Sequence, residues 1–135
     1  VSKGAHALFY PHGLGHMLGL DVHDMEGLGE DLVGYDDKNQ RSDQFGLAYL
    51  RFSKDLEPGF VLTVEPGIYF ISHLIDQWKA DNKLSEHINY AEVEKFKGFG
   101  GIRIEDNIAI SDKGYSVLGP HIPKTTEEIE DIMQS

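Results

Sequence analysis

Two segments of the chain alternate apolar and polar residues with a period close to two. Residues 61–65 are rich in β-branched side chains and end at Pro66, which stops strand pairing. Residues 101–110 carry isoleucine at most alternate positions, with Glu105 on the polar face. Both segments are predicted strands, and the turn before residues 115–118 predicts a hairpin into a third. A shorter strand is expected over residues 47–51.

Apolar residues return at helical spacing in three further segments. Residues 71–78 repeat them every three to four positions, which predicts a helix. Asn89 followed by Glu92 has the pattern of a capping box, and so has Thr125 followed by Glu128. We expect the last helix to bury a stripe made of Ile129, Ile132 and Met133. Together these elements predict a mixed α/β unit built on an antiparallel or mixed sheet.

Residues 1–24 fit neither periodicity, because glycine interrupts them at every second to fourth position. His12 and His16 have the spacing of a helical zinc pair, but the glycines between them disfavour a helix. We expect short extended pieces joined by bends, with His16 at a strand end and open space for a metal around it. Two interpretations remain open, a structural histidine cluster and a metal site. Residues 25–46 read as a long polar loop, either a functional rim or a tolerated insertion.

The composition excludes several classes of function. Twelve basic and 23 acidic residues give a formal charge of −11, and no basic cluster is present, so a nucleic-acid partner is not expected. The excess carboxylates are either solubilising surface or ligands for hard cations. The absence of cysteine excludes disulfides, thiolate metal sites and a cysteine nucleophile. No apolar run is long enough to span a bilayer, so we expect a cytoplasmic protein without a membrane partner.

Two glutamates stand out against their strands. Glu65 ends an apolar strand and is expected to be at least half buried, so it needs a partner, either an arginine (Arg51 or Arg103) or a metal. Glu105 shares a strand face with Arg103, which indicates either a solvated face or a cleft wall where Arg103 orients Glu105. With His16, these carboxylates form a donor set that suits manganese, cobalt, iron or zinc.

Four motifs together resemble a known family. Residues 11–16, 20–24, 62–69 and 98–106 are similar, in order and spacing, to the prolidases (Xaa-Pro dipeptidases), which are pita-bread metallopeptidases. The resemblance covers nearly the entire chain. It implies an α+β fold, the C-terminal half of a pita-bread (creatinase/aminopeptidase-like) fold with a curved antiparallel or mixed sheet and helices on one face. It identifies residues 1–135 as the C-terminal part of the catalytic domain, without its first half and without the N-terminal domain.

The resemblance also implies roles for individual residues. The metal ligands would be His16, Glu65 and Glu105, holding two divalent ions in the full-length enzyme, with manganese the first expectation. Glu65 and His23 would be catalytic, while His12, His23 and Arg51 would bind the substrate and Arg103 would support the site. The family's two aspartate ligands precede the histidine, and residues 1–15 contain no aspartate. The chain alone is therefore expected to bind metal weakly and to be inactive.

The implied activity is hydrolysis of Xaa-Pro dipeptides by a metal-activated water, in a homodimeric enzyme. Three alternatives stay open: a non-catalytic pita-bread binding scaffold, an aminopeptidase P-like exopeptidase, and a module that binds one metal ion with an added aspartate. Retention of the three expected ligands argues against the scaffold.

Overall fold

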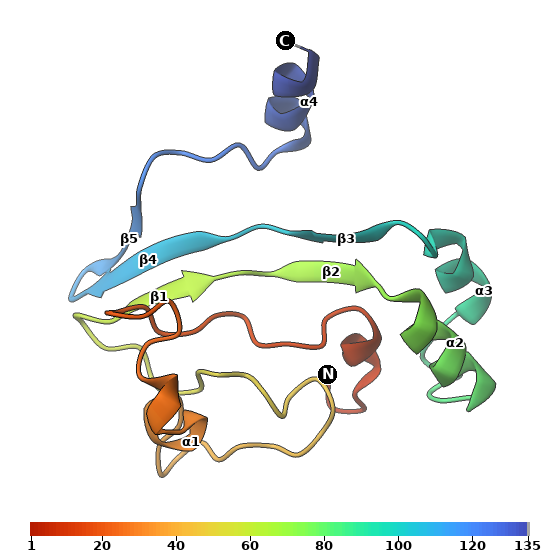
Figure 1. Cartoon of the computed structure of the whole chain (residues 1–135), viewed down its shortest axis with the longest axis horizontal. Helices are drawn as coiled ribbons and strands as arrows, with labels where there is room; N and C mark the ends of the chain where they lie inside the picture. Colours follow the sequence, from red (N-terminus) through yellow and green to blue (C-terminus); the bar gives the residue numbers. More distant parts are fainter. Residues whose placement is uncertain (135) are drawn as a thin grey trace.

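The structure is a computed structural model that describes residues 1–134, and two long antiparallel strands run through its centre (Figure 1). The strands are β1 (Val61–Val64), β2 (Gly67–Phe70), β3 (Gly100–Arg103), β4 (Asp106–Ser111) and β5 (Gly114–Leu118). One long strand runs from β1 into β2 and the other from β3 into β4, so that β1 pairs with β4 and β2 with β3. The remaining strand, β5, pairs with the other edge of β4, giving the order β1-β4-β5.

Both long strands are interrupted at the same level. Proline has no N–H to give to a strand ladder, and Pro66 follows β1. Pairing persists there as one bond from Ile104 N to Pro66 O at 3.1 Å. The single strand predicted over residues 101–110 is therefore wrong in its middle, because the proline that breaks it lies on the partner strand. The strand prediction at residues 61–65 and the hairpin into β5 are confirmed.

The glycine- and histidine-rich segment lies along the free edge of β1. Backbone bonds join Leu18 N to Val61 O at 2.9 Å, Thr63 N to His16 O at 2.9 Å, and Glu65 N to Leu14 O at 2.7 Å. Met17 forms an isolated antiparallel bridge with Leu62. The expected extended piece is confirmed over residues 14–18, where it places His16 directly beside the strand that leads to Glu65. The expectation is wrong at Ala5–Leu8, which form a 3-10 helix, η1.

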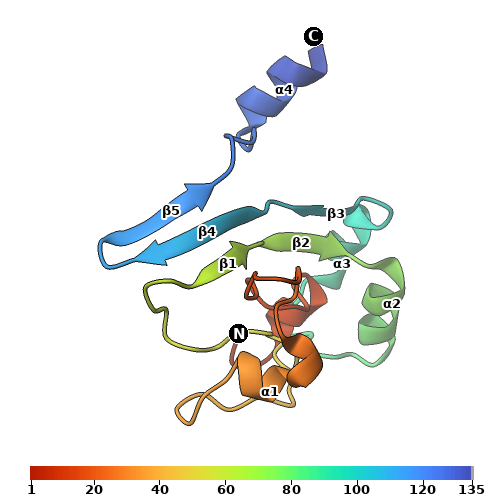
Figure 2. The same ribbon diagram turned by 60° about the vertical axis from the view of Figure 1, so that its left-hand side comes forward.

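Helices surround the ribbon of strands. They are η1 (Ala5–Leu8), η2 (Glu26–Leu28), α1 (Glu30–Val33), α2 (Ser72–Ala80), α3 (Tyr90–Val93), η3 (Glu94–Phe96) and α4 (Thr126–Gln134). α2 and α3 cover the end where β2 meets β3, α1 lies on one side of the strands, and α4 projects from the other (Figures 1 and 2). The buried core lies at the α2 end and consists of Ala7, Leu8, Ile75, Trp78, Ile88 and Val93.

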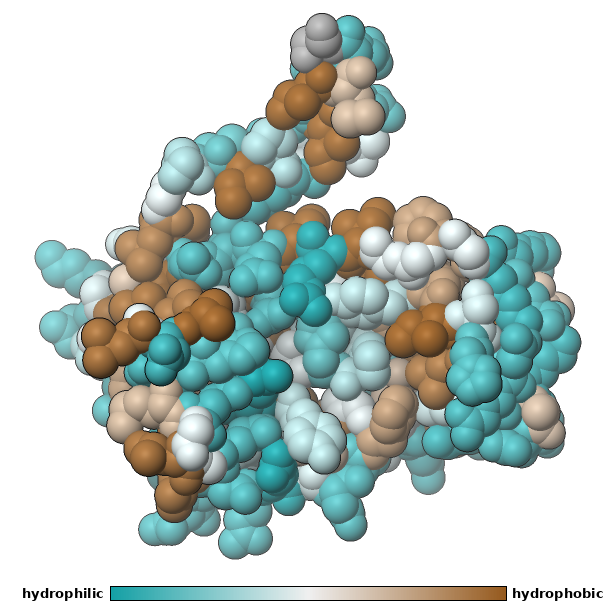
Figure 3. Space-filling view, in the orientation of Figure 1, coloured by the Kyte–Doolittle hydropathy of each residue, from teal (hydrophilic) through white to brown (hydrophobic). Residues whose placement is uncertain are grey.

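The predicted caps are confirmed, but one predicted buried face is not. Asn89 Oδ1 accepts a bond from Glu92 N at 3.3 Å, and Thr125 exchanges bonds with Glu128 in a reciprocal capping box. The stripe on α4 is exposed, however, with Ile129 at 47% and Met133 at 80%. The reason is that α4 stands away from the strands, and apolar side chains gather on it and on the strand surface below (Figure 3). None of the helices within residues 1–134 is long and apolar enough to cross a membrane.

Two further expectations are wrong. Residues 47–51 do not form a strand: residues 45–49 are a turn, and Arg51 has a φ of 63°, in the left-handed region. Residues 25–46 are not entirely loop, because they contain η2 and α1. These short helices place acidic residues next to Arg51, as described below.

Candidate active site

One cavity of about 240 Å³ brings together nearly all of the predicted site residues. It is bounded by the histidine-rich segment, the end of β1, the end of β3 and the turn that carries Arg51. Its lining residues are His12, Gly13, Gly15, His16, His23, Arg51, Glu65 and Arg103. Among the residues described by the structure, Glu105 is the predicted site residue that does not line this cavity.

His16 and Glu65 form the buried centre of this cavity, with only 5% and 7% of their surfaces exposed. His16 Nδ1 lies 3.0 Å from Met17 O, and a carbonyl can only accept, so Nδ1 carries the hydrogen. The lone pair of a neutral His16 then lies on Nε2, which faces Glu65 Oε1 at 3.2 Å. Two acceptors this close need a proton or a metal cation between them.

Thr63 fixes this pair from behind. Its side chain is 1% exposed, and its hydroxyl accepts a bond from His16 N at 2.9 Å and donates one to Glu65 Oε1 at 3.0 Å. Sequence reasoning missed Thr63 as a site residue. The available signal was a hydroxyl on the same face of the strand as Glu65, in an otherwise apolar segment.

Glu105 lies opposite Glu65 in the paired strands. Val64 pairs with Asp106 and Gly67 with Arg103, so continuing the register into the interruption sets Glu65 against Glu105. Arg103 Nη1 lies 3.0 Å from Glu65 Oε2 and 4.0 Å from Glu105 Oε2. Like charges directly opposite one another in an antiparallel pair are destabilising. The guanidinium of Arg103 provides the counter-charge to both carboxylates.

The glycines act differently from the expectation. A Cβ on Gly15 would lie 1.9 Å from Thr63 O, and one on Gly13 would lie 2.1 Å from Leu50 O. The space that a side chain would need is therefore filled by the backbone of Thr63 on β1 and of Leu50, and it is not left open for a metal. Gly15 lets the histidine-bearing segment approach closely enough to bond to β1, and Gly13 lets it approach Leu50.

A directed chain of hydrogen bonds joins Arg103 to His12. Arg103 Nε donates to the hydroxyl of Tyr69 at 2.8 Å, which leaves that hydroxyl to donate to His12 Nε2 at 3.0 Å. His12 Nδ1 donates to Gly13 O at 2.7 Å, which fixes the tautomer that this requires. The bond to Tyr69 is the main cause that raises the pKa of Arg103 above its ordinary value. Sequence reasoning missed Tyr69, because the sequence gives no sign of its partners.

His23 and Arg51 occupy the outer part of the cavity. The rings of His23 and His16 are perpendicular, with their centroids 4.2 Å apart. The guanidinium of Arg51 pairs with the carboxylate of Glu26, and His23 Nδ1 lies 3.8 Å from the same carboxylate oxygen. Glu26 was not predicted as a site residue.

The donor types in the cavity fit a divalent cation, since a buried imidazole nitrogen and a buried carboxylate oxygen converge there. Within residues 1–134, no three histidine, aspartate or glutamate side chains are grouped closely enough to hold a metal ion. Glu105, whose side chain is 45% exposed, lies outside the buried pair. The described residues thus bring two candidate donors together, and a complete set of metal ligands would need further donors.

Comparisons with known proteins give the family. Residues 2–112 match the family model of metallopeptidase family M24. The chain is 47% identical over 127 residues to the human Xaa-Pro dipeptidase, covering 94% of this chain and 24% of the human protein. It is 43% identical over 128 residues to a probable Xaa-Pro aminopeptidase of Paracoccidioides brasiliensis, covering 95% of this chain and 25% of that protein.

Solved structures agree with the sequence relatives. Aminopeptidase P from E. coli with the inhibitor Pro-Leu superposes with a TM-score of 0.61 at 35% identity, covering 98% of this chain and 22% of that one. The chain thus spans about a quarter of the length of the curated relatives that it matches. The chain belongs to metallopeptidase family M24, and its fold is part of the pita-bread fold of that family.

Proposed function

We propose that the protein to which these residues belong is a metal-dependent dipeptidase that hydrolyses Xaa-Pro dipeptides. The observation that carries this proposal is the convergence of three histidines, two arginines and Glu65 on one cavity. The most similar curated relatives support it, because they are named Xaa-Pro dipeptidase. The chain covers only part of their length, so residues 1–135 are proposed to be the C-terminal part of the catalytic domain.

Family M24 is a family of metallopeptidases, which implies divalent metal ions. We propose His16, Glu65 and Glu105 as the ligands from this chain, with the remaining ligands supplied by residues outside it. Two ions are proposed, with manganese ahead of cobalt, zinc and iron. When bound, they supply an activated water and a polarised substrate carbonyl.

The chain's own residues would bind the substrate and move protons. Arg51 would pair with the free carboxylate of a dipeptide, since a guanidinium matches a carboxylate through two parallel bonds. Glu65 would accept a proton at a carboxylate oxygen, and His23 would donate to the oxygen where negative charge develops. His12, which is held by its hydrogen bond with Tyr69, would line the substrate side of the cavity. Arg103 would keep the two glutamates in place.

A second candidate is an exopeptidase of the aminopeptidase P kind, which several relatives represent. The position of Arg51 in the cavity favours the dipeptidase, because a cation there recognises a carboxylate that a longer peptide does not offer at this position. Comparing hydrolysis of Gly-Pro with that of Gly-Pro-Leu separates the two candidates.

The deciding experiment uses the full-length protein with Mn²⁺ and Gly-Pro. We expect hydrolysis by the wild type and its loss in each of His16→Ala, Glu65→Ala and Glu105→Ala. The control is Glu86→Ala, which removes an exposed carboxylate beside His87 and should leave the enzyme active. A full-length protein that binds a protein partner and hydrolyses no Xaa-Pro peptide would establish the non-catalytic scaffold instead.

The proposal also includes a cytoplasmic location and a homodimeric state. Cell fractionation tests the location, and analytical sedimentation tests the oligomeric state.

A further inference from the structure

Glu26 contacts two residues of the proposed substrate cavity, Arg51 and His23. It is not one of the expected metal ligands, and the proposed mechanism gives it no role. One of its oxygens, Oε2, accepts from Arg51 Nη1 and lies 3.8 Å from His23 Nδ1. Its other oxygen, Oε1, is buried and has no hydrogen-bond partner within the described residues. Leaving a buried acceptor unpaired is unfavourable, so the position of this carboxylate needs an explanation. The contacts of Glu26 with Arg51 and His23 suggest that it serves the cavity.

We propose that Glu26 is a positioning residue for substrate recognition: it aims the guanidinium of Arg51 at the C-terminal carboxylate of the dipeptide. This inference rests on the proposed function. Glu26 occupies one nitrogen of the guanidinium, and the planar group has further N–H donors on its fork. Those donors stay available to a substrate carboxylate in the cavity.

The backbone around Arg51 shows that its placement is enforced. Arg51 has a φ of 63°, a conformation that non-glycine residues adopt only when their surroundings hold them. The amide N–H of Arg51 donates to Glu30 Oε1 at 2.9 Å, and Ser53 N donates to Gly34 O at 2.7 Å. Both partners lie on or next to α1, so the segment that carries Glu26 also holds the backbone of Arg51.

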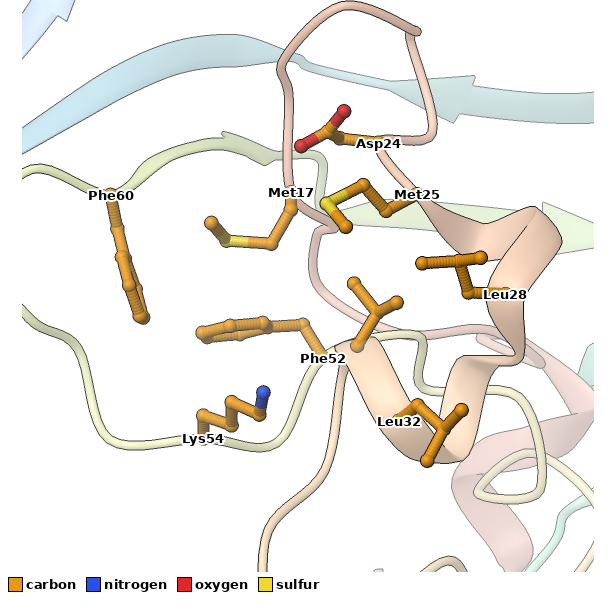
Figure 4. A pocket seen from close by; sticks show the side chains of 9 residues that line it. Met17, Asp24, Met25, Leu28, Leu32, Phe52, Lys54 and Phe60 are labelled. Atoms are coloured by element: carbon orange, nitrogen blue, oxygen red, sulfur yellow. The ribbon is translucent and has the colours of Figure 1, made fainter.

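An apolar pocket joins the same two segments. The pocket has a volume of about 290 Å³, and Figure 4 shows its lining side chains. Met25 and Leu28, on either side of Glu26, line it together with Phe52, which follows Arg51 directly. Figure 4 shows all three pointing into the shared space. The neighbours of Glu26 and of Arg51 thus line one apolar pocket, and the ion pair sets the direction of the guanidinium.

The advantage of this arrangement is entropic. A free arginine side chain loses rotamer freedom when a ligand immobilises it, and that loss weakens binding. Glu26 immobilises Arg51 before the substrate arrives. The negative charge of Glu26 has the opposite effect, because it repels the incoming carboxylate. Substitutions of Glu26 that remove only its charge or only its hydrogen-bond acceptor can therefore distinguish the two effects on substrate binding.

The test measures KM and kcat for Gly-Pro in the full-length protein with Mn²⁺. Glu26→Ala removes the acceptor, and Glu26→Asp keeps the charge but withdraws the acceptor by one methylene. Both should raise KM, Glu26→Ala by about tenfold, the binding lost when the substrate itself must immobilise a free arginine side chain. Both should leave kcat within about twofold of the wild-type value, in keeping with lost substrate binding. Glu26→Gln keeps an acceptor without the charge, so its KM should equal or fall below that of the wild type.

Asp31→Ala is the matched control, since Asp31 is an acid on α1 that pairs with Arg41 outside the cavity. Its KM should not change. The inference is overturned if Glu26→Ala and Glu26→Asp leave KM unchanged, or if Glu26→Gln raises KM as much as Glu26→Asp does. It is also overturned if Glu26→Ala lowers kcat/KM equally for Gly-Pro and Gly-Pro-amide, because that amide lacks the carboxylate. A wild type that does not hydrolyse Gly-Pro would overturn the proposed function itself, which keeps the two failures distinct.

Discussion

Glu65 lies directly opposite Glu105 at the point where both long strands are interrupted. A strand interior would hold two facing carboxylates only at a cost, and Arg103 offsets it by lying between them, 3.0 Å from one and 4.0 Å from the other. The break in pairing at Pro66 and the pair of acids thus occur at one place. The sheet is locally irregular where the candidate metal ligands are.

Removal of Arg103 should therefore destabilise the metal-free protein. Arg103→Ala leaves Glu65, which is buried, facing Glu105 without a counter-charge, and we expect the free energy of unfolding to fall by about 1–3 kcal/mol. Urea denaturation measures this change. Lys38→Ala breaks a solvent-exposed pair with Asp55 and should leave the free energy of unfolding nearly unchanged. Equal behaviour of the two variants would contradict a role for Arg103 between the glutamates.

Thr63 should be important through its hydroxyl alone. Thr63→Val keeps the shape but leaves His16 N without its acceptor and Glu65 Oε1 without its donor, at a cost of about 1–3 kcal/mol. Thr63→Ser restores the hydroxyl and should recover most of that loss. Thermal unfolding with and without Mn²⁺ measures both effects. If Thr63→Val proved as stable as the wild type, the hydroxyl would not be fixing the His16–Glu65 pair.

Gly15 should not tolerate any side chain. A Cβ there would meet Thr63 O at 1.9 Å, so Gly15→Ala must push the histidine-bearing segment off β1, at a cost of about 3 kcal/mol or more. The control is Gly27→Ala, where a Cβ would meet nothing within 4 Å, and this variant should be neutral or slightly more stable. The amide exchange rate of Thr63, whose N–H bonds to His16 O, reports the detachment directly.

The start of α4 should respond to acid. The backbone N–H groups of Lys124 and Thr125, with His121, lower the pKa of Glu128 from 4.5 to about 2. A lowered pKa means that the stabilisation is complete above pH 4.5 and is lost as the pH falls toward 2. NMR chemical shifts of the Lys124 and Thr125 amides should follow that titration. In Glu128→Gln both amides should lose the response, and a response that persisted there would assign it to another group.

Much of the fold could be predicted from local sequence. The ends of β1, the caps at Asn89 and Thr125 and the hairpin into β5 each depend on residues within a few positions of one another. The interruption of the long strand at Ile104 could not be predicted in this way, since its cause, Pro66, lies on the partner strand. The exposed stripe on α4 shows a limit of a different kind. An amphipathic pattern indicates that a face is suited to burial, but not what lies against it.

The site shows the same division. His16, Glu65 and Arg103 were found because their residue types are unusual in glycine-rich or strand contexts, and one cavity brings them together. Glu26 and Tyr69 were missed because each is ordinary in its own segment and gains meaning only from a partner more than twenty residues away. The ligand, catalytic and substrate-binding roles predicted for these residues and for Glu105 all stay predictions.

The pairing of residues 14–18 with β1 has a consequence for solubility. A strand with an unpaired edge is a template for another chain, and this segment covers the edge of β1 that β4 leaves open. The histidine that faces Glu65 and the backbone that shields the sheet from aggregation are thus the same piece of chain. Variants that loosen this segment should lower the yield of soluble protein as well as its activity.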